Sequence, residues 1–301
     1  MMKPNTNYER VDALTHISNQ IYPILEHQEP REISARRLLR LGVAGIATAL
    51  RGGDSPSIAG SKFDTYLSYE LRDVDFGKYE PYRTHANTPP HHVDVPMSLG
   101  RLANNYGNIQ RMTYLTSLTR EPDSVHALHL TALAVPYARA HYPDLDSGKV
   151  ALYGPLHDIL EAYTGDFPTF AITPEDLRRK KIQEENAHRL FTIQYGHDWP
   201  ELVAVVEAYE TLADDEAAFV KTMDKNDPGY THFRNDAYAL KHEHGVETAE
   251  AFYNQARINT LRTLGYASRF ALVLEDKDVL NEHIAALFDS QNETTPIVAK
   301  S

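Results

Sequence analysis

Apolar residues recur along most of the chain at the three- and four-residue spacing of amphipathic helices. Within residues 10–28 the apolar stripe consists of Val11, Leu14, Ile17, Ile21 and Ile24. Pro23 predicts a kink or a break in this helix, because proline lacks the backbone donor that the helix needs. Residues 33–50 carry a second stripe, so the chain is predicted to open with two helices.

The pattern changes over roughly residues 51–96, where glycine, proline and other turn-forming residues are frequent. This composition predicts a long connection that holds one short helix near Thr65–Leu71. Helical spacing resumes at Ser98 and continues almost to the end of the chain. No segment of useful length alternates as a β-strand does, so the sequence predicts an all-α fold.

Several later helices have recognisable ends. Asp146 and Ser147 stand at the head of one helical segment, and Thr173 precedes Pro174 as an N-cap residue does. Gly196 is expected to end the helix that begins there. Further helices are predicted near residues 200–212, 214–226, 246–264 and 277–289.

Composition narrows the chemistry open to these 301 residues. The chain has no cysteine, which excludes disulfides, a cysteine nucleophile, cysteine-ligated zinc and iron–sulfur clusters. A metal ion would therefore be held by histidine, aspartate or glutamate. The 30 basic and 42 acidic residues give a net charge of −12, which makes nucleic acid and anionic membranes poor partners.

The hydropathy pattern also indicates where in the cell the protein is expected. The first residues contain no apolar run, so we expect no signal peptide. No stretch approaches the roughly 18 apolar residues of a membrane span. The sequence predicts a cytoplasmic protein whose partner is a small molecule.

The segment from Leu156 to Thr169 concentrates groups that are able to do chemistry. On the predicted helix, Glu161 follows His157 by four residues and Asp158 by three, so the three side chains share a flank. Imidazole and carboxylate together suit a divalent ion. The third carboxylate is then free to orient or deprotonate a water molecule.

Other segments supply the remaining ligands of such a site. His126 begins a helix upstream, and Asp224 ends one downstream, with Asp227 as a rival on the same face. His126, His157, Asp158 and Asp224 then form a set of two nitrogen and two oxygen ligands.

The order of these residues resembles the HD-domain phosphohydrolase superfamily. The string HDILEAYTGDFPT is similar to the pattern HD-x-x-E-x-x-T-G-D-x-P-T of bacterial HD-domain 5′-deoxynucleotidases. His126 precedes the string, and Asp224 follows it after Val220 and Lys221. The stretch from Gln110 to Leu115 corresponds to the part of that family that contributes a nucleotide-binding arginine. The chain departs from the family pattern at Val125 and at Pro155, which is expected to bend the helix just before His157.

The resemblance implies a role for each matched residue. It implies one divalent ion, such as Mn, Co, Fe, Ni, Zn or Mg, held by His126, His157, Asp158 and Asp224. Glu161 would position or activate the attacking water, with Asp166 as a second acid nearby. Arg111 and Lys221 would bind the substrate. The implied reaction is hydrolysis of a (deoxy)nucleotide, as a 5′-nucleotidase or a dNTP triphosphohydrolase.

The resemblance also suggests an organisation for the whole chain. Residues 97–290 would form the HD-domain helical bundle, preceded by an N-terminal helical extension and connection over residues 1–96. Residues 291–301 would be a flexible tail. By analogy with related enzymes, the protein is expected to form a homo-oligomer, in the simplest case a homodimer.

Other residues of similar composition have simpler interpretations. His129 is expected to support the ligands or to pack in the core. The pairs His91-His92 and His197-Asp198 and the triplet His242-Glu243-His244 are expected at the solvated surface. The basic run Arg178-Arg179-Lys180-Lys181 is expected to be a solvated helix face balanced by Glu184 and Glu185.

Two further functions remain open from the sequence. An HD-type di-iron oxygenase would need extra ligands, for which His129 and Asp166 are the candidates. A non-catalytic nucleotide-binding or regulatory protein could keep the HD scaffold, although the complete ligand set and Glu161 argue against that hypothesis.

Overall fold

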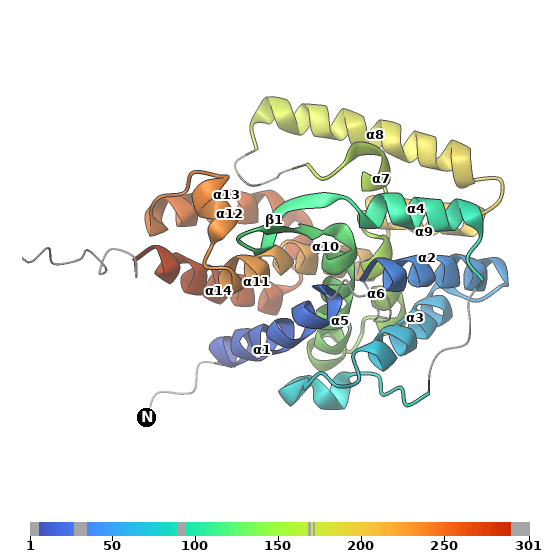
Figure 1. The fold of residues 1–301 in the computed structure, drawn as a ribbon, viewed down its shortest axis with the longest axis horizontal. Helices are drawn as coiled ribbons and strands as arrows, with labels where there is room; N and C mark the ends of the chain where they lie inside the picture. The colour runs from blue at the N-terminus through green and yellow to red at the C-terminus, as the bar shows by residue number, and fades with distance from the viewer. Residues whose placement is uncertain (1–5, 27–34, 89–93, 168–169, 171, 290–301) are drawn as a thin grey trace, which may run out of the picture.

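The fold is taken from a computed structural model that describes residues 6–26, 35–88, 94–167, 170 and 172–289. Helices form most of this part of the chain, which confirms the predicted all-α class (Figure 1). The predicted tail at residues 291–301 lies outside the described residues, as does the pair His91-His92.

The elements follow one another in a nearly all-helical order. They are α1 (Thr6–Glu26), α2 (Ala35–Arg51), α3 (Pro56–Glu70), η1 (Gly77–Tyr82), α4 (Met97–Gly107), β1 (Gln110–Thr116), β2 (Thr119–Pro122), α5 (Asp123–His141), α6 (Ser147–Tyr153), η2 (Gly154–Leu156), α7 (Glu161–Thr164), α8 (Pro174–Tyr195), α9 (Pro200–Glu210), α10 (Asp215–Asp224), α11 (Asp227–Arg234), α12 (Tyr238–His242), α13 (Ala249–Ala267) and α14 (Ala271–Asp289).

The two predicted N-terminal helices correspond to α1 and α2. Pro23 does not break α1, which continues through it to Glu26. The apolar stripe of α2 is buried as its spacing requires, with Leu38, Leu39, Val43 and Ile46 all inaccessible to solvent.

The prediction of a long connection after α2 is wrong, because α3 is a full helix of 15 residues. Its start has the expected chemistry: the Ser55 hydroxyl accepts a hydrogen bond from the Ile58 amide, and Pro56 occupies the first turn. Gly60 lies against Gly148 of α6 so closely that a Cβ at position 60 would be 1.8 Å from the Gly148 carbonyl oxygen. The small residues that suggest a loop therefore allow two helices to pack backbone to backbone.

One short β-hairpin accompanies the helices, although no segment of the sequence alternates over a useful length: β1 and β2 pair antiparallel. Tyr114 pairs with Arg120 across the two strands, and both side chains bind Glu243 beyond the hairpin. The hairpin is irregular, with register shifts on both sides of Tyr114. It carries Arg111 and leads directly into α5.

The later helices confirm the predicted boundaries more closely. The hydroxyl of Thr173 accepts a hydrogen bond from the Asp176 amide at 3.1 Å, and α8 ends at Tyr195, before Gly196. The Asp146 carboxylate caps α6 in the same way, accepting hydrogen bonds from the Gly148 and Lys149 amides. The four helices predicted farther along correspond to α9, α10, α13 and α14.

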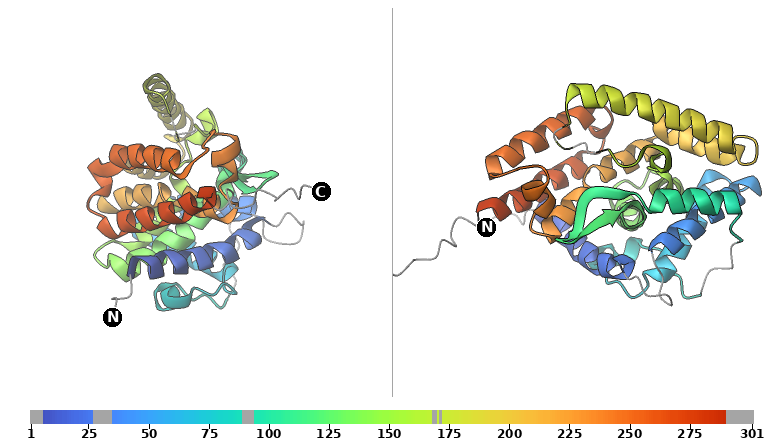
Figure 2. Two further views of the ribbon diagram at one scale, coloured as in Figure 1. Left: turned by 90° about the vertical axis from the view of Figure 1, so that its left-hand side faces the viewer. Right: turned by 45° about the horizontal axis from the view of Figure 1, so that its top comes forward.

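Helix α5 is the most enclosed of the long helices, and every residue from Asp123 to Ala138 is buried. The other helices surround it on several sides (Figures 1 and 2). One apolar core runs from Val11 of α1 to Phe288 of α14, so the segments before residue 97 share their core with the bundle that follows. In the described part of the chain, no helix is both long enough and apolar enough to cross a membrane.

Candidate metal centre

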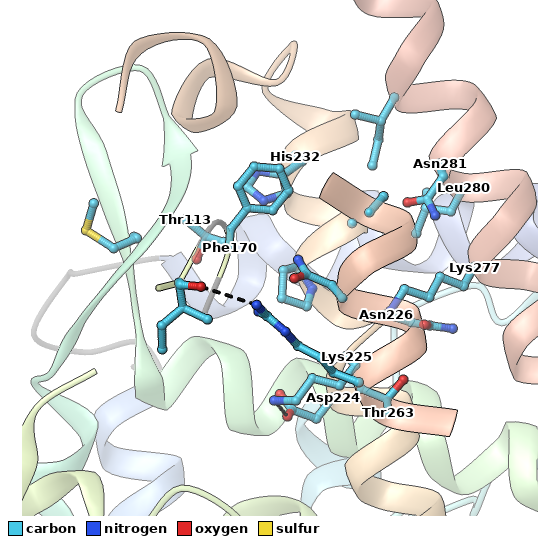
Figure 3. A pocket seen from close by; sticks show the side chains of 18 of the residues that line it. Thr113, Phe170, Asp224, Lys225, Asn226, His232, Thr263, Lys277, Leu280 and Asn281 are labelled. Atoms are coloured by element: carbon cyan, nitrogen blue, oxygen red, sulfur yellow. Dashed lines mark hydrogen bonds and ion pairs between the residues drawn. The ribbon is translucent and has the colours of Figure 1, made fainter. Parts of the chain in front are cut away.

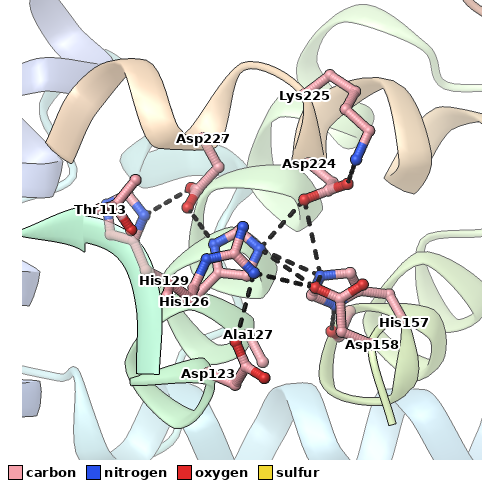
Figure 4. A network of polar contacts seen from close by, with 12 residues as sticks. Thr113, Asp123, His126, Ala127, His129, His157, Asp158, Asp224, Lys225 and Asp227 are labelled. Atoms are coloured by element: carbon pink, nitrogen blue, oxygen red, sulfur yellow. Dashed lines mark hydrogen bonds and ion pairs between the residues drawn. The ribbon is translucent and has the colours of Figure 1, made fainter. Parts of the chain in front are cut away.

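Four side chains from three parts of the fold converge at the end of α10. His126 comes from α5, His157 and Asp158 from the turn after η2, and Asp224 from the last residue of α10 (Figure 4). Their nearest ligand atoms all lie within 4.8 Å of one another. The structure thus brings together the four residues that the sequence suggests as ligands.

The distances within this cluster are short. Nε2 of His126 lies 3.1 Å from Nε2 of His157 and 3.1 Å from Oδ1 of Asp224. Asp158 Oδ2 lies 2.8 Å from Nε2 of His157 and 3.9 Å from Nε2 of His126. His126, His157 and Asp224 are buried, whereas Asp158 is partly exposed, so the cluster is accessible from the side of Asp158.

The turn that carries His157 and Asp158 is not part of the expected α-helix. Helix α6 ends at Tyr153, before Pro155, and η2 and a turn follow up to α7. Nδ1 of His157 donates a hydrogen bond to the Gly154 carbonyl at 2.7 Å, which directs Nε2 into the cluster. Gly154 packs so tightly on α5 that a Cβ there would lie 2.1 Å from Oγ1 of Thr131.

The other imidazole is held from behind by Asp227. Oδ2 of Asp227 accepts a hydrogen bond from Nδ1 of His126 at 2.7 Å, and Oδ1 accepts one from Nδ1 of His129 at 2.6 Å. The ring of Tyr22 stacks on His129 with 4.2 Å between centroids. Asp224 therefore belongs to the cluster, and its rival Asp227 orients His126. His129 is fully buried behind it, as a supporting residue is expected to be.

The geometry of the cluster fits a divalent ion. A metal about 2.1 Å from each ligand separates neighbouring ligand atoms by ~3.0–3.4 Å at octahedral and tetrahedral angles. The distance between the two histidine nitrogens is 3.1 Å, and the four distances from a histidine nitrogen to a carboxylate oxygen range from 2.8 to 3.9 Å. Both imidazoles present Nε2 to the centre, and their other nitrogens are occupied by acceptors.

Both carboxylates of the cluster are ionised, as metal ligands must be. Burial alone would raise the pKa of Asp224, but Lys225 and the two histidines hold that pKa well below its usual range. Burial also acts to raise the pKa of Asp158. The opposing effect of His157 and Arg111 is larger, so the pKa of Asp158 is lowered.

Arg111 lies beside the cluster on β1. Its guanidinium donates to Oδ2 of Asp158 at 3.1 Å and contacts Oδ1 of Asp123 at 3.4 Å. Asp166 approaches the same strand, and its Oδ2 accepts a hydrogen bond from the Met112 amide at 3.1 Å. The two residues thus flank the exposed edge of the cluster from β1 and from the turn after α7.

Glu161 lies near Asp158 and Asp123, and ligand atoms of the three carboxylates lie within 4.8 Å of one another. Burial, together with the charges of Asp158 and Asp123, raises the pKa of Glu161 well above its usual value. Its Oε2 is buried and has no hydrogen-bond partner in the described part of the chain. A carboxylate in this position is suited to accept or hold a proton.

Lys221 lies apart from the cluster. Its ammonium lies 5.4 Å from the centroid of the Tyr209 ring, and the same ring is a T-shaped neighbour of the His157 imidazole. The lysine at the cluster is Lys225, whose Nζ is 2.5 Å from Oδ2 of Asp224. Its position directly after Asp224 is the signal in the sequence that could have identified it.

A cavity of about 310 Å³ opens beside the cluster (Figure 3). Arg111, Asp166, Asp224 and Lys225 contribute to its wall at the cluster, and helices α11, α13 and α14 supply most of the remaining wall. His244 is partly exposed and also lines this cavity, whereas its neighbours His242 and Glu243 are exposed, as predicted for the triplet. The volume is at the lower end of the range for small-molecule pockets.

The remaining polar motifs lie at the surface, as predicted. The His197 side chain is almost fully exposed next to Asp198, so this second HD dipeptide has no part in the cluster. In the basic run, Lys180 pairs with Glu184 at 2.6 Å, and Arg179 pairs with Asp176 at 2.9 Å. Arg178, Arg179 and Lys181 are exposed as predicted, whereas Lys180 is partly buried.

Comparison with known proteins adds one finding. A family model described as an HD domain matches residues 104–262, which is more than half of the chain. The matched region begins in α4 and ends in α13, and it contains the four residues of the cluster together with Arg111, Glu161 and Asp166. Searches of curated proteins and of solved structures found no match.

Proposed function

The chain belongs to the HD-domain family, and we propose that it is a metal-dependent phosphohydrolase that acts on 5′-nucleotides, in particular deoxynucleotides. HD domains are generally metal-dependent hydrolases, and the buried cluster fits a divalent ion. The observation that carries the proposal is the convergence of four ligand groups beside a cavity large enough for a small organic phosphate.

We assign His126, His157, Asp158 and Asp224 as the residues that would hold the metal. A divalent ion bound there would supply Lewis acidity, which polarises a phosphoryl oxygen and lowers the pKa of water. Asp227 and the Gly154 carbonyl orient the two imidazoles before any ion binds. Metal binding therefore costs little conformational entropy at these two side chains.

The neighbouring residues have complementary tasks. Glu161 is placed to take a proton from the attacking water, since its Oε2 has no partner among the described residues. Burial and the charges of Asp158 and Asp123 raise its pKa, and an ionised carboxylate with a raised pKa is the stronger base. Arg111 is the cation nearest to Asp158, and a planar guanidinium suits bidentate binding of a phosphate. Asp166, held by the Met112 amide, faces the cavity and is suited to accept a hydrogen bond from a sugar hydroxyl.

The direct test is phosphate release from ribo- and deoxynucleoside mono-, di- and triphosphates, each assayed with Mn, Co, Fe, Ni, Zn and Mg. The test variant is Asp158→Ala, and the matched control is Asp198→Ala, which alters the second and exposed HD dipeptide. Inorganic phosphate from monophosphates, absent in Asp158→Ala and retained in Asp198→Ala, is the expected result for a 5′-nucleotidase.

Other outcomes have equally definite meanings. Tripolyphosphate released from deoxynucleoside triphosphates would make the protein a triphosphohydrolase. Absence of turnover with every nucleotide and every metal, in protein shown to bind metal, would refute the proposal.

No observation favours the di-iron oxygenase. Neither His129 nor Asp166 belongs to a group of converging ligand atoms among the described residues. Nδ1 of His129 bonds to Asp227, and Oδ2 of Asp166 bonds to the Met112 amide. The non-catalytic hypothesis predicts that a part of the catalytic set is missing, whereas Glu161 and all four cluster residues are present together.

A further inference from the structure

Lys277 of α14 lines the cavity from the wall formed by the C-terminal helices, and β1 lies on another side of the same space (Figure 3). The residue is only 8% exposed. No hydrogen bond or ion pair joins its ammonium to any residue in the part of the chain that the structure describes. It lies beyond residue 262, where the match to the HD family ends.

The other cations near the cluster already have anionic neighbours. The guanidinium of Arg111 contacts Asp158 and Asp123, and Lys225 contacts Asp224 at 2.5 Å. Arg262, at the rim of the cavity, is exposed to solvent. Asp224 and Asp278 attract the Lys277 ammonium, but no carboxylate among the described residues forms an ion pair or hydrogen bond with it.

Burial of this ammonium is unfavourable, because it removes part of the hydration and no direct partner among the described residues replaces it. Burial and the positive charge of Lys225 lower the pKa of Lys277 to about 8, and together they outweigh the attraction of Asp224 and Asp278. A buried group with a shifted pKa that lines a cavity is a candidate for ligand binding, because a bound anion would replace the interactions that burial removes.

The wall around Lys277 indicates what else the ligand contains. Phe170, Phe252 and Tyr266 supply aromatic faces, and Asn259 and Asn281 supply amide groups that donate and accept hydrogen bonds. An aromatic and amide-lined wall suits a planar heterocycle next to an anionic group. A volume of about 310 Å³ favours a compact monoester over a molecule that also carries a polyphosphate tail.

We propose that Lys277 binds the phosphoryl group of the substrate and that the substrate is a compact phosphate monoester with a planar organic part. This inference rests on the proposed phosphohydrolase function. It adds a substrate-binding residue from α14, outside the region matched by the family, to the residues of the cluster.

The test uses inorganic phosphate as the probe, titrated calorimetrically into the Mn²⁺-loaded full-length protein. Lys277→Met removes the charge while keeping a flexible apolar chain of similar length, and Lys277→Arg keeps the charge. Lys181→Met, which alters an exposed lysine of α8, is the matched control. We expect Lys277→Met to weaken phosphate binding about tenfold or more, and Lys277→Arg to restore most of it.

A second readout separates ligand binding from a structural role. If Lys277 has no internal partner, Lys277→Met removes an unfavourable buried charge and Tm rises. A fall in Tm for Lys277→Met would indicate a structural role and overturn the inference. Hydrolysis of a monophosphate should show a raised KM in Lys277→Met, whereas Lys181→Met should match the unaltered protein.

The failure of this inference can be told apart from the failure of the proposed function. Equal phosphate affinity in the unaltered protein and Lys277→Met would overturn the role of Lys277, even where nucleotides are hydrolysed. Phosphate binding that depends on Lys277, in a protein that hydrolyses no nucleotide, would support Lys277 as an anion ligand and refute the proposed function.

Discussion

Asp227 accepts a hydrogen bond from Nδ1 of His126 at 2.7 Å, which leaves Nε2 of the same ring facing His157 and Asp224. The carboxylate therefore selects the tautomer and the orientation that a metal ligand needs. Because its second oxygen binds His129, Asp227 holds two buried imidazoles at once.

We expect Asp227→Asn to lower metal affinity about 10- to 100-fold, because an amide offers a single oxygen to two imidazole donors. Isothermal titration with Mn²⁺ measures this change. Asp198→Asn, at an exposed aspartate, should bind the metal as the unaltered protein does. An unchanged affinity in Asp227→Asn would show that the orientation of His126 does not depend on Asp227.

Glu161 lies beside the cluster and is not one of its four ligands. Glu161→Gln should therefore retain its metal while kcat falls about 100-fold or more, since the amide is unable to take a proton. Metal content and kcat measured on the same preparation check both parts. Glu185→Gln, on the exposed face of α8, is the control. Loss of metal from Glu161→Gln would reclassify Glu161 as a ligand.

The contact between α3 and α6 depends on glycine at position 60. In Gly60→Ala the new methyl group would meet the Gly148 carbonyl, so the helices must move apart, which costs about 1–3 kcal/mol of the free energy of unfolding. Urea unfolding measures this loss. Gly265→Ala in α13 meets no atom within 4 Å and should stabilise the protein by about 0.5–1 kcal/mol. Equal midpoints for the two variants would contradict the observed packing.

His141 makes the stability depend on pH, away from the metal centre. Burial, with the charges of Arg10 and Lys78, lowers the pKa of His141 from its ordinary value of 6.5 to about 4, and its Nε2 lies 3.1 Å from the Tyr79 hydroxyl. Between pH 6.5 and pH 4, His141 is therefore protonated in the unfolded chain and neutral in the folded protein. The contribution of His141 is complete above pH 6.5 and is lost as the pH falls toward 4.

We expect His141→Gln to lose less stability than the unaltered protein between pH 7.5 and pH 4.5, because glutamine does not titrate and still offers an oxygen to Tyr79. Urea unfolding at the two pH values gives the comparison. A parallel loss in both proteins would mean that His141 is not the titrating group.

Much of the centre could be predicted because its residues are close in sequence or have a fixed order. His157, Asp158 and Glu161 lie within five residues, and the family pattern supplies the flanking histidine and aspartate. The backbone conformation around His157 and Asp158 could not be predicted. Pro155 ends the helical hydrogen bonding, and a turn held by the Gly154 carbonyl replaces the expected helix.

Other features depend on contacts that no local pattern records. From the sequence alone, Gly60 indicates a loop. Its role in helix packing depends on Gly148, which is far away in the sequence. Lys221 and Lys225 are equally plausible cations until α10 is oriented and places Lys225 at Asp224. Lys277 belongs to no motif, and only the packing of α14 brings it to the cavity.

The central claim is that one divalent ion binds among His126, His157, Asp158 and Asp224. The most direct test is a crystal of the Mn²⁺-loaded protein examined by anomalous scattering. We predict one strong peak about 2.0–2.3 Å from Nε2 of both histidines and from an oxygen of each carboxylate. A fully loaded crystal with no peak there, or with its peak at other residues, would contradict the claim.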